Sequence, residues 1–271
     1  MATGHVDRAA IPNQLKTHTR GPKEKMPPNI IVETAPNEPT DPNMADWHEL
    51  SVARRRGVVE RTKDFILAKL DRHEKRDDES VPDSLLESCV EERHHKFYGR
   101  PWCLGRDHAD HLLDRGLKPS DNFLDLGCGS LRTGVFVIPH LDSSRYFGMD
   151  AHKPSLEAAA CYEIPLNDLE IKKPRLLHSS QFELEYWNTK FNWIFAFALF
   201  KKNHVGEDLQ RIAFEKISRV LADDGVMVIS PPLDESQIVL IAEYGLAVSH
   251  QEVQICKIID DQINWMEIIK A

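Results

Sequence analysis

Residues 122 to 134, Asn-Phe-Leu-Asp-Leu-Gly-Cys-Gly-Ser-Leu-Arg-Thr-Gly, join a short apolar run to a glycine-rich turn and a new helical pattern. The apolar residues predict a buried strand. Gly127 and Gly129 predict a sharp turn in which the backbone can approach a ligand closely, because glycine has no Cβ. Ser130 and Leu131 are predicted to begin a helix whose free N–H groups face that ligand. The stretch therefore predicts a strand, a ligand-binding turn and a helix in succession.

An acidic residue ends the next apolar run. Asp150 follows Gly127 by 23 residues, close to the spacing of about 20 for the ribose-binding acid of a nucleotide-binding βαβ unit. A carboxylate at the end of a second strand can accept hydrogen bonds from two ribose hydroxyls. Where a dinucleotide-binding turn has a third small residue, this chain has Arg132, which argues against a dinucleotide. We therefore expect a cofactor with a single nucleoside.

The rest of the chain alternates between apolar runs and helical patterns. Apolar runs lie at 122–126, 145–149, 175–178, 192–199 and 225–230, with helical patterns at 131–140, 155–163 and 207–221. Such alternation predicts an α/β fold with a doubly wound, mostly parallel sheet. A short helix at 234–244, followed by extended stretches at 246–259 and 262–269, predicts a C-terminal antiparallel hairpin.

These features together resemble the class I S-adenosylmethionine-dependent methyltransferases. The resemblance rests on Phe123-Leu-Asp-Leu-Gly-Cys-Gly129, Tyr146-Phe-Gly-Met-Asp150 and Arg219-Val-Leu-Ala-Asp-Asp-Gly-Val-Met-Val-Ile229, and it covers roughly residues 95 to 271. Gly-Cys-Gly-Ser-Leu-Arg at 127–132 is similar to a subgroup of bacterial-type enzymes within that superfamily. The resemblance implies a Rossmann-like sheet of seven strands that is completed by the hairpin and binds S-adenosyl-L-methionine.

The resemblance also implies a set of cofactor-binding residues. It assigns Asp125 to the methionine end of the cofactor and Ala198 to a backbone contact beneath that moiety. Gln181 and Phe182 inherit the contact with adenine. Other interpretations remain open: Asp125 as a turn cap, Phe182 as a core residue and Arg132 as a surface cation. The full set is Asp125, Gly127, Cys128, Gly129, Arg132, Asp150, Ala151, Gln181, Phe182 and Ala198.

One histidine follows the fourth strand of the predicted sheet, near the expected reaction centre. Methyl transfer from a sulfonium is an in-line displacement, so the enzyme mainly aligns the nucleophile and excludes water. With an ordinary pKa of about 6.5, His204 can act as general base toward a hydroxyl or ammonium acceptor. The alternative is a surface or structural histidine.

Residues 94–111 precede the sheet and are rich in histidine and aromatic side chains. We expect this segment to cap the cofactor, with Tyr98 and Trp102 lining the acceptor pocket. Arg100 or Arg106 is expected to meet a carboxylate there. No metal is predicted, because the segment lacks a second pair of cysteines. The alternative is a zinc site formed by Cys103, His108 and His111.

Composition restricts the class of protein. The chain has 271 residues, a net charge of −9 and 41% apolar residues. An acidic chain opposes a nucleic-acid substrate, because nucleic-acid binders use clustered Lys and Arg. Five widely spaced cysteines without a Cys-x-x-Cys pair favour reduced thiols and a cytoplasmic location. No apolar run of about 18 residues predicts a membrane span, and an N-terminal transit peptide stays an alternative.

Three segments are predicted. Residues 1–45 form a disordered tail, since seven of the sixteen prolines lie within residues 1–43 and little apolar surface is available to offset the cost of ordering. Residues 46–115 form N-terminal helices that cap the site, with Arg54, Arg55 and Arg56 on a solvated face. Residues 116–271 form the methyltransferase catalytic domain.

The predicted function is transfer of a methyl group from S-adenosyl-L-methionine to a small-molecule acceptor, through an O, N or S atom. Neither nucleic acid nor membrane is predicted as a partner, and the sequence does not indicate an oligomeric state. One alternative is a catalytically silent S-adenosylmethionine-binding regulatory or scaffold protein. Another is a nicotinamide-dependent oxidoreductase, against which Arg132 and the terminal hairpin argue.

Overall fold

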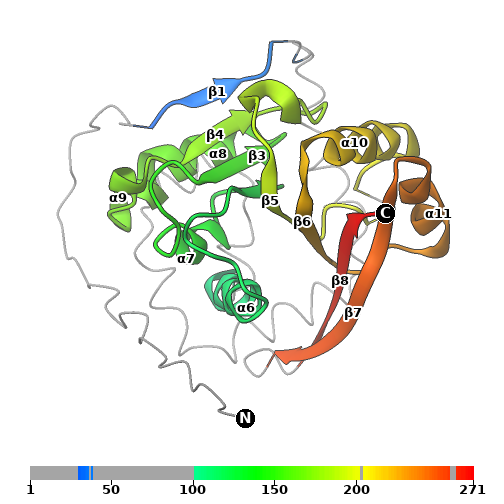
Figure 1. Cartoon of the computed structure of the whole chain (residues 1–271). Coiled ribbons are helices and arrows are strands. Elements are labelled where there is room, and N and C mark those ends of the chain that lie inside the picture. Colours follow the sequence, from blue (N-terminus) through cyan, green and yellow to red (C-terminus); the bar gives the residue numbers. More distant parts are fainter. Residues whose placement is uncertain (1–29, 37, 39–100, 202–203, 257–260) are drawn as a thin grey trace, which may run out of the picture.

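The structure, a computed structural model, describes residues 30–36, 38, 101–201, 204–256 and 261–271. Its centre is one eight-stranded sheet with the spatial strand order β1-β4-β3-β2-β5-β6-β8-β7 (Figure 1). The strands are β1 (Val32–Thr34), β2 (Phe123–Leu126), β3 (Tyr146–Asp150), β4 (Arg175–His178), β5 (Phe191–Phe197), β6 (Leu221–Ser230), β7 (Leu246–Cys256) and β8 (Asp261–Lys270).

The chain winds the sheet in two directions from its centre. From β2 it passes to β3 and β4 on one side, then returns to β5 and β6 on the other, and all these strands are parallel. The order therefore reverses between β2 and β5, which is where open α/β sheets bind their ligands. Strand β8 is antiparallel to both β6 and β7. The predicted α/β class, doubly wound sheet and C-terminal hairpin are confirmed.

Helices cover both faces of the sheet (Figure 1). One face carries α10 (Glu207–Val220), α11 (Glu235–Glu243) and the 3₁₀ turn η4 (Leu184–Trp187). The other carries α6 (Pro101–Asp114), α7 (Gly134–Val137), α8 (Lys153–Ala158), the π-helix η2 (Ala159–Glu163) and α9 (Ile164–Leu166). A further 3₁₀ turn, η3, spans Glu170–Lys172. Within the described ranges, no helix has the length and apolarity needed to cross a membrane.

The strands are buried on both faces, so their apolar runs are continuous rather than alternating. In β2, Leu124 lies in the core under α10, whereas Phe123 lies in the core under α6. In β5, Ile194 lies in the core under α10 and Phe195 lies in the core under α6. All four side chains are at most 1% exposed. Each such burial contributes about 1.5–3 kcal/mol of transfer free energy, which fixes the register of the central strands.

The sheet has one strand more than predicted. Strand β1 pairs in parallel with β4 at the edge of the sheet, and Ala35 behind it is 3% exposed. The prediction of a disordered tail over residues 1–45 is therefore wrong for residues 32–34. The segment is short and flanked by prolines, so the pairing with β4 rather than a local pattern creates the strand. Residues 30, 31, 35, 36 and 38 of the predicted tail are also described, whereas its other residues and most of the predicted cap lie outside the described residues.

Helix α6 packs directly on the sheet. Ala109 and Leu112 are at most 1% exposed and belong to the core on that face, although the predicted boundary at 115/116 assigns them to a cap. Gly105 brings α6 close to the turn after β2: a Cβ added there would lie 1.9 Å from the carbonyl oxygen of Arg132. A side chain at position 105 therefore cannot fit without a backbone shift.

Gly105→Ala is expected to lower the free energy of unfolding by about 2 kcal/mol, because the cost of overpacking exceeds the gain in helix propensity. Urea denaturation followed by tryptophan fluorescence measures the change. Gly206→Ala is the control, since a Cβ there meets nothing within 4 Å, and its cost is expected to stay below about 1 kcal/mol. Equal stability of Gly105→Ala and the parent would show that α6 does not approach the turn this closely.

Candidate functional site

The turn after β2 has the backbone conformation that its glycines predict. Gly127 and Gly129 have φ angles of 74° and 53°, a region that side chains with a Cβ seldom adopt. The N–H groups of Gly127 and Cys128 both donate to the carbonyl oxygen of Met149, at 2.8 and 3.2 Å. The turn is thus anchored to the end of the neighbouring strand β3. Gly127 is exposed, whereas the Cys128 side chain is buried.

Asp150, the last residue of β3, ties the two turns together. Its Oδ2 accepts from the N–H of Gly129 at 2.8 Å, and its Oδ1 accepts from the N–H of His152 at 2.7 Å. The structure thus brings the predicted turn and the predicted ribose-binding acid into direct contact. A carboxylate offers about four acceptor sites, and these two bonds leave about half of that capacity. Ala151 follows in the same turn, half-buried.

The helix predicted to begin at Ser130 and Leu131 begins later. Leu131 has a φ of 76°, its N–H donates to the carbonyl oxygen of Cys128 at 2.9 Å, and its side chain is fully buried. The chain therefore makes a second turn, and α7 starts only at Gly134 and has four residues. The predicted helix start at Ser130 and Leu131 is therefore wrong. The burial of Leu131 decides this conformation over the local helical pattern.

Asp125 is buried on the α6 side of β2, at 3% exposure. The hydroxyl of Tyr146 donates to its Oδ2 at 2.8 Å. Burial raises the pKa of Asp125 to about 7, and the nearby charge of Asp150 raises it further, while the Tyr146 hydrogen bond and the positive charge of Arg132 oppose the shift. Burial likewise raises the pKa of the Tyr146 hydroxyl well above its ordinary value. Near neutral pH this carboxyl is poised between its neutral and charged forms.

The turn after β4 contains the two residues that the resemblance assigns to adenine. Gln181 lies within this turn, and its side chain is half-buried. Phe182 has a φ of 53° and a side chain that is 5% exposed, in the core beside Phe200, with their ring centroids 6.3 Å apart. The structure therefore places Phe182 in the core, as one of the two interpretations expects. Of the two, Gln181 is the side chain with the greater access to a ligand.

The turn after β5 lies opposite the glycine turn. A Cβ added to Gly127 would lie 3.5 Å from a methyl group of Leu199, so the two turns flank the position where the strand order reverses. Ala198 has a φ of 59°, and its N–H donates to the carbonyl oxygen of Ser230 at 2.6 Å. His204 Nδ1 lies 2.8 Å from the carbonyl oxygen of Ala198. Because a carbonyl only accepts, this Nδ1 carries a proton.

Two of the three predicted acceptor-binding residues, Tyr98 and Arg100, lie outside the described residues, and the side chain of Trp102 is not described either. The described part of α6 instead places His108 against Thr133, in the segment that follows β2. His108 is fully buried, its Nδ1 lies 3.0 Å from the hydroxyl of Thr133, and its ring packs on Phe197 with centroids 4.2 Å apart. Burial, followed by the charge of Arg132, lowers the pKa of His108 well below its usual value.

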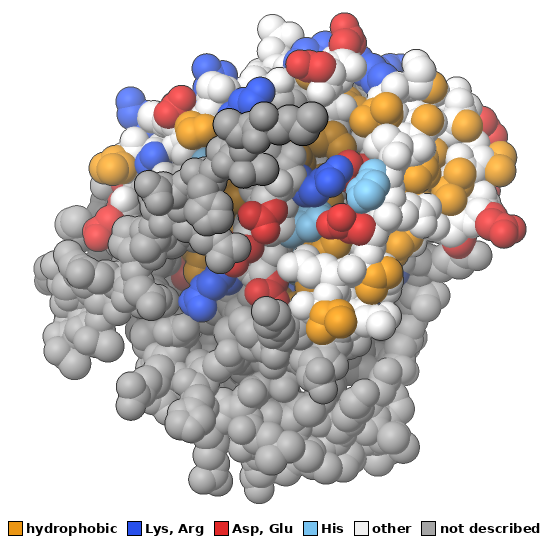
Figure 2. Space-filling view, turned by 60° about the horizontal axis from the view of Figure 1, so that its bottom comes forward, with side chains coloured by type: hydrophobic (Ala, Val, Ile, Leu, Met, Phe, Trp, Pro, Cys, Tyr) orange, Lys and Arg blue, Asp and Glu red, His pale blue; other side chains and the backbone are white. Residues whose placement is uncertain are grey.

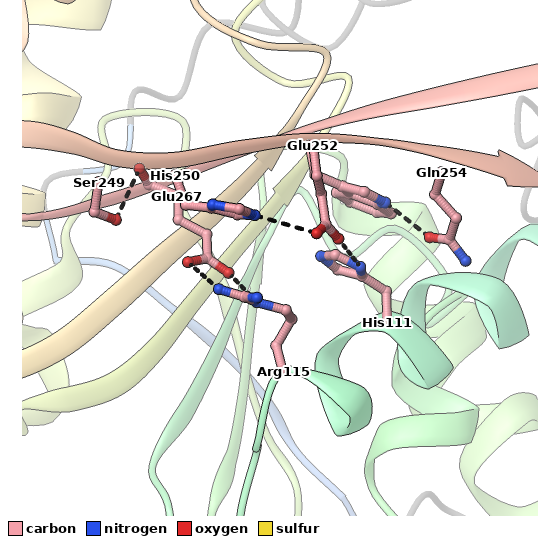
Figure 3. A network of polar contacts seen from close by, with 8 residues as sticks. His111, Arg115, Ser249, His250, Glu252, Gln254 and Glu267 are labelled. Atoms are coloured by element: carbon pink, nitrogen blue, oxygen red, sulfur yellow. Dashed lines mark hydrogen bonds and ion pairs between the residues drawn. The ribbon is translucent and has the colours of Figure 1, made fainter.

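A polar network joins α6 to the C-terminal hairpin (Figure 3). His111 stacks on Trp265 with centroids 4.3 Å apart, and its Nδ1 lies 3.2 Å from a carboxylate oxygen of Glu252. Arg115 donates two hydrogen bonds to Glu267, at 2.5 and 2.8 Å. Figure 2 shows histidine, acidic and basic side chains gathered near the middle of the face that comes forward. The network fixes the hairpin against the helix that precedes β2.

Cys103, the cysteine of the zinc alternative, has a side chain that is not described, whereas His108 and His111 lie in the described part of the chain. There, no three His, Cys, Asp or Glu side chains are grouped as a metal ion would need. His108 and His111 bind Thr133 and Glu252 instead. Burial lowers the pKa of His111 although Glu252 opposes the shift. Both histidines therefore serve as packing and hydrogen-bonding groups, a role that their spacing of three residues on one helix face could have indicated.

Comparison with solved structures places this fold among the methyltransferases. The glycopeptide N-methyltransferase MtfA in complex with sinefungin matches with a TM-score of 0.50 and 12% identity, over 62% of this chain and 94% of MtfA. MtfA in complex with S-adenosyl-L-homocysteine matches with a TM-score of 0.50 and 13% identity, over 62% of this chain and 90% of MtfA. The magnesium protoporphyrin IX methyltransferase ChlM from Synechocystis PCC 6803, with bound S-adenosylmethionine, matches with a TM-score of 0.49 and 11% identity, over 65% and 83% of the two chains.

No protein-family model matches the chain, and no curated protein sequence does. Identities of 12% and 13% show a common fold and nothing finer. The shared architecture is the Rossmann-like methyltransferase fold: a mostly parallel sheet that ends in an antiparallel hairpin.

The raised pKa of Asp125 predicts a specific pH dependence. Between about pH 4 and pH 7, Asp125 keeps a proton in the folded state that it releases in the unfolded chain. The contribution of Asp125 to the free energy of unfolding is therefore complete below the pKa that Asp125 has in the unfolded chain. It is lost as the pH rises through about 7. The loss has a slope of up to about 1.4 kcal/mol per pH unit. Asp125→Asn removes the titration while keeping an acceptor for Tyr146.

Urea denaturation at several pH values from 4.5 to 8 tests this expectation. The stability of Asp125→Asn relative to the parent should rise with pH across this range. Asp142→Asn changes an exposed carboxylate before β3 and is the control for the loss of one negative charge. Parallel curves for Asp125→Asn and the parent would contradict the raised pKa.

Proposed function

We propose that the chain is an S-adenosyl-L-methionine-dependent methyltransferase that acts on a small-molecule acceptor. The contact between Gly129 and Asp150, at the carboxyl ends of two adjacent parallel strands, carries this proposal. It lies beside the position where the strand order reverses. MtfA, whose fold the chain shares, is a glycopeptide N-methyltransferase that was solved with sinefungin and with S-adenosyl-L-homocysteine.

The residues of the site fit the adenosyl group and the methionine end of S-adenosyl-L-methionine. Two backbone N–H groups occupy part of the acceptor capacity of Asp150, and the remaining lone pairs suit the two ribose hydroxyls. Gly127 is exposed and has no Cβ, so a ligand can approach its backbone. We assign Gln181 to adenine. We also assign the methionine end to Asp125, Arg132 and the turn at Ala198, with Cys128, Ala151 and Phe182 as supporting residues of the pocket.

Bound S-adenosyl-L-methionine supplies a methyl group that is already activated by its sulfonium. The protein then needs to align the acceptor and keep water out, and alignment alone can contribute about 7 to 11 kcal/mol. His204 is the residue we propose as general base, because its bond to Ala198 holds the ring in the turn after β5, close to the glycine turn. We place the acceptor between this turn and α6, with Tyr98, Arg100 and Trp102 as proposed contacts.

A small acceptor agrees with the acidic character of the chain, which has a net charge of −9 and therefore repels polyanions. A cytoplasmic location is part of the proposal and rests on the five cysteines, which contain no Cys-x-x-Cys pair.

Calorimetric titration with S-adenosyl-L-methionine and with NADH tests the cofactor. We expect the parent to bind the first and not the second, and Asp150→Ala to lose about 1–3 kcal/mol of binding free energy, because buried hydroxyls lose a charged acceptor. Asp142→Ala, which removes an exposed carboxylate before β3, should bind like the parent. Binding of NADH instead, or equal affinity in Asp150→Ala, would contradict the proposal.

A methyl-acceptor screen, read out by release of S-adenosyl-L-homocysteine, tests the reaction. With an acceptor in hand, His204→Gln should lower turnover by about 100-fold at unchanged cofactor affinity, which is the usual scale for removing a general base. His250→Gln, at a side chain that is 41% exposed on the hairpin, is the control and should keep the parent's turnover. Cofactor binding without any product would instead favour a regulatory or scaffold protein.

A further inference from the structure

The N-terminal strap, residues 30–36 and 38, runs along the edge of the sheet beside the proposed cofactor pocket. Its strand β1 pairs with β4 from Val32, opposite Leu176, to Thr34, opposite His178. Beyond the strand, the N–H of Ala35 donates to the carbonyl oxygen of His178 at 3.0 Å. The strap therefore runs parallel to β4 and leaves the sheet at the carboxyl end of β4, the edge at which the turns of the pocket lie.

Glu38, at the end of the strap, inserts a carboxylate into the turn after β4. Its two oxygens lie 3.0 and 2.8 Å from the backbone nitrogen of Ser180. Its side chain is 9% exposed, and one oxygen lies 3.9 Å from Nε2 of His178. A carboxylate that is this well buried is costly unless donors satisfy it. The bond from Ser180 is charge-assisted, and it is therefore stronger and more directional than a neutral hydrogen bond.

The turn that Glu38 holds is itself joined to the turn that carries Asp150. The N–H of Ser179 donates to the carbonyl oxygen of Asp150 at 3.0 Å, and Nε2 of His178 lies 3.1 Å from the carbonyl oxygen of Ala151. Within the turn after β4, the hydroxyl oxygen of Ser179 accepts from the N–H of Gln181 at 3.3 Å. Glu38 is thus connected through one hydrogen-bonded turn to the backbone of the proposed ribose-binding residue.

We propose that Glu38 is a positioning residue for the adenosyl half of the cofactor. Glu38 lies beyond the edge strand β1, outside the other seven strands of the sheet, and holds the turn from Ser179 to Gln181. This side of the proposed adenine pocket is therefore formed before the ligand binds. Preforming this wall raises affinity because the turn does not have to be ordered on binding. The inference rests on the proposed function, which supplies the ligand. The contact itself does not depend on it.

Two measurements on the full-length chain test the inference. In the first, calorimetric titration with S-adenosyl-L-methionine, Glu38→Ala should weaken binding about tenfold. Glu38→Gln should stay within about threefold of the parent, because its amide oxygen can still accept from Ser180. Glu33→Ala is the matched control: Glu33 lies on the same strap but is directed to Arg175, at 3.7 Å, and we expect affinity within about twofold of the parent.

The second measurement, hydrogen exchange at the amide of Ser180, needs no ligand. Exchange should be faster in Glu38→Ala than in the parent, Glu38→Gln or Glu33→Ala, whereas a general loss of strap stability would move Glu33→Ala as well. Should Glu38→Ala fail to fold, Glu38→Asp takes its place, because it keeps the charge but withdraws the carboxylate by one methylene. Its exchange should also be faster and its binding weaker.

The outcomes separate the two proposals. If the parent does not bind S-adenosyl-L-methionine, the proposed function fails and the role of Glu38 in cofactor binding fails with it. If the parent binds, equal affinity in Glu38→Ala, or an equal loss in Glu33→Ala, overturns the inference alone. Unchanged exchange at Ser180 in Glu38→Ala overturns it whatever the parent binds.

Discussion

The carboxylate of Asp150 is the group on which the site depends. It accepts one N–H from the glycine turn after β2 and one from its own turn after β3, so the exits of two parallel strands are held in one arrangement. Positive φ angles at Gly127 and Gly129 allow the first of these turns to reach the carboxylate. A charged carboxylate forms stronger hydrogen bonds with backbone N–H groups than a neutral acceptor does. Asp150 therefore stabilises this one conformation among those that the glycines allow.

The turns around Asp150 are supported from two sides. On the α6 side, Gly105 allows the helix to contact the backbone of Arg132, and His108 binds Thr133 at the end of the same turn. The stacking of His111 on Trp265 carries this support to the hairpin. On the opposite edge of the sheet, the strap holds the turn after β4. The site is therefore framed by segments that lie far apart in the sequence, from the strap to the C-terminal hairpin (Figure 1).

The central strands could be predicted because both faces of the sheet are buried, which requires continuous apolar runs, and the glycine turn because only glycine adopts its backbone angles readily. The helix start could not be predicted: the burial of Leu131 overrides the local pattern. Strand β1 and Glu38 carry no local signal, since pairing with β4 and the amide of Ser180 define them. The spacing of Gly127 and Asp150 indicated a shared ligand, but it did not reveal the hydrogen bond between Gly129 and Asp150 or the burial of Asp125.

A crystal structure of the full-length chain with S-adenosyl-L-homocysteine tests the account most directly. The account predicts both ribose hydroxyls within about 3.2 Å of the carboxylate oxygens of Asp150, with the glycine turn beneath the ligand and the adenine beside the turn after β4. A ligand bound elsewhere on the sheet, or bound here with its ribose away from Asp150, would contradict it.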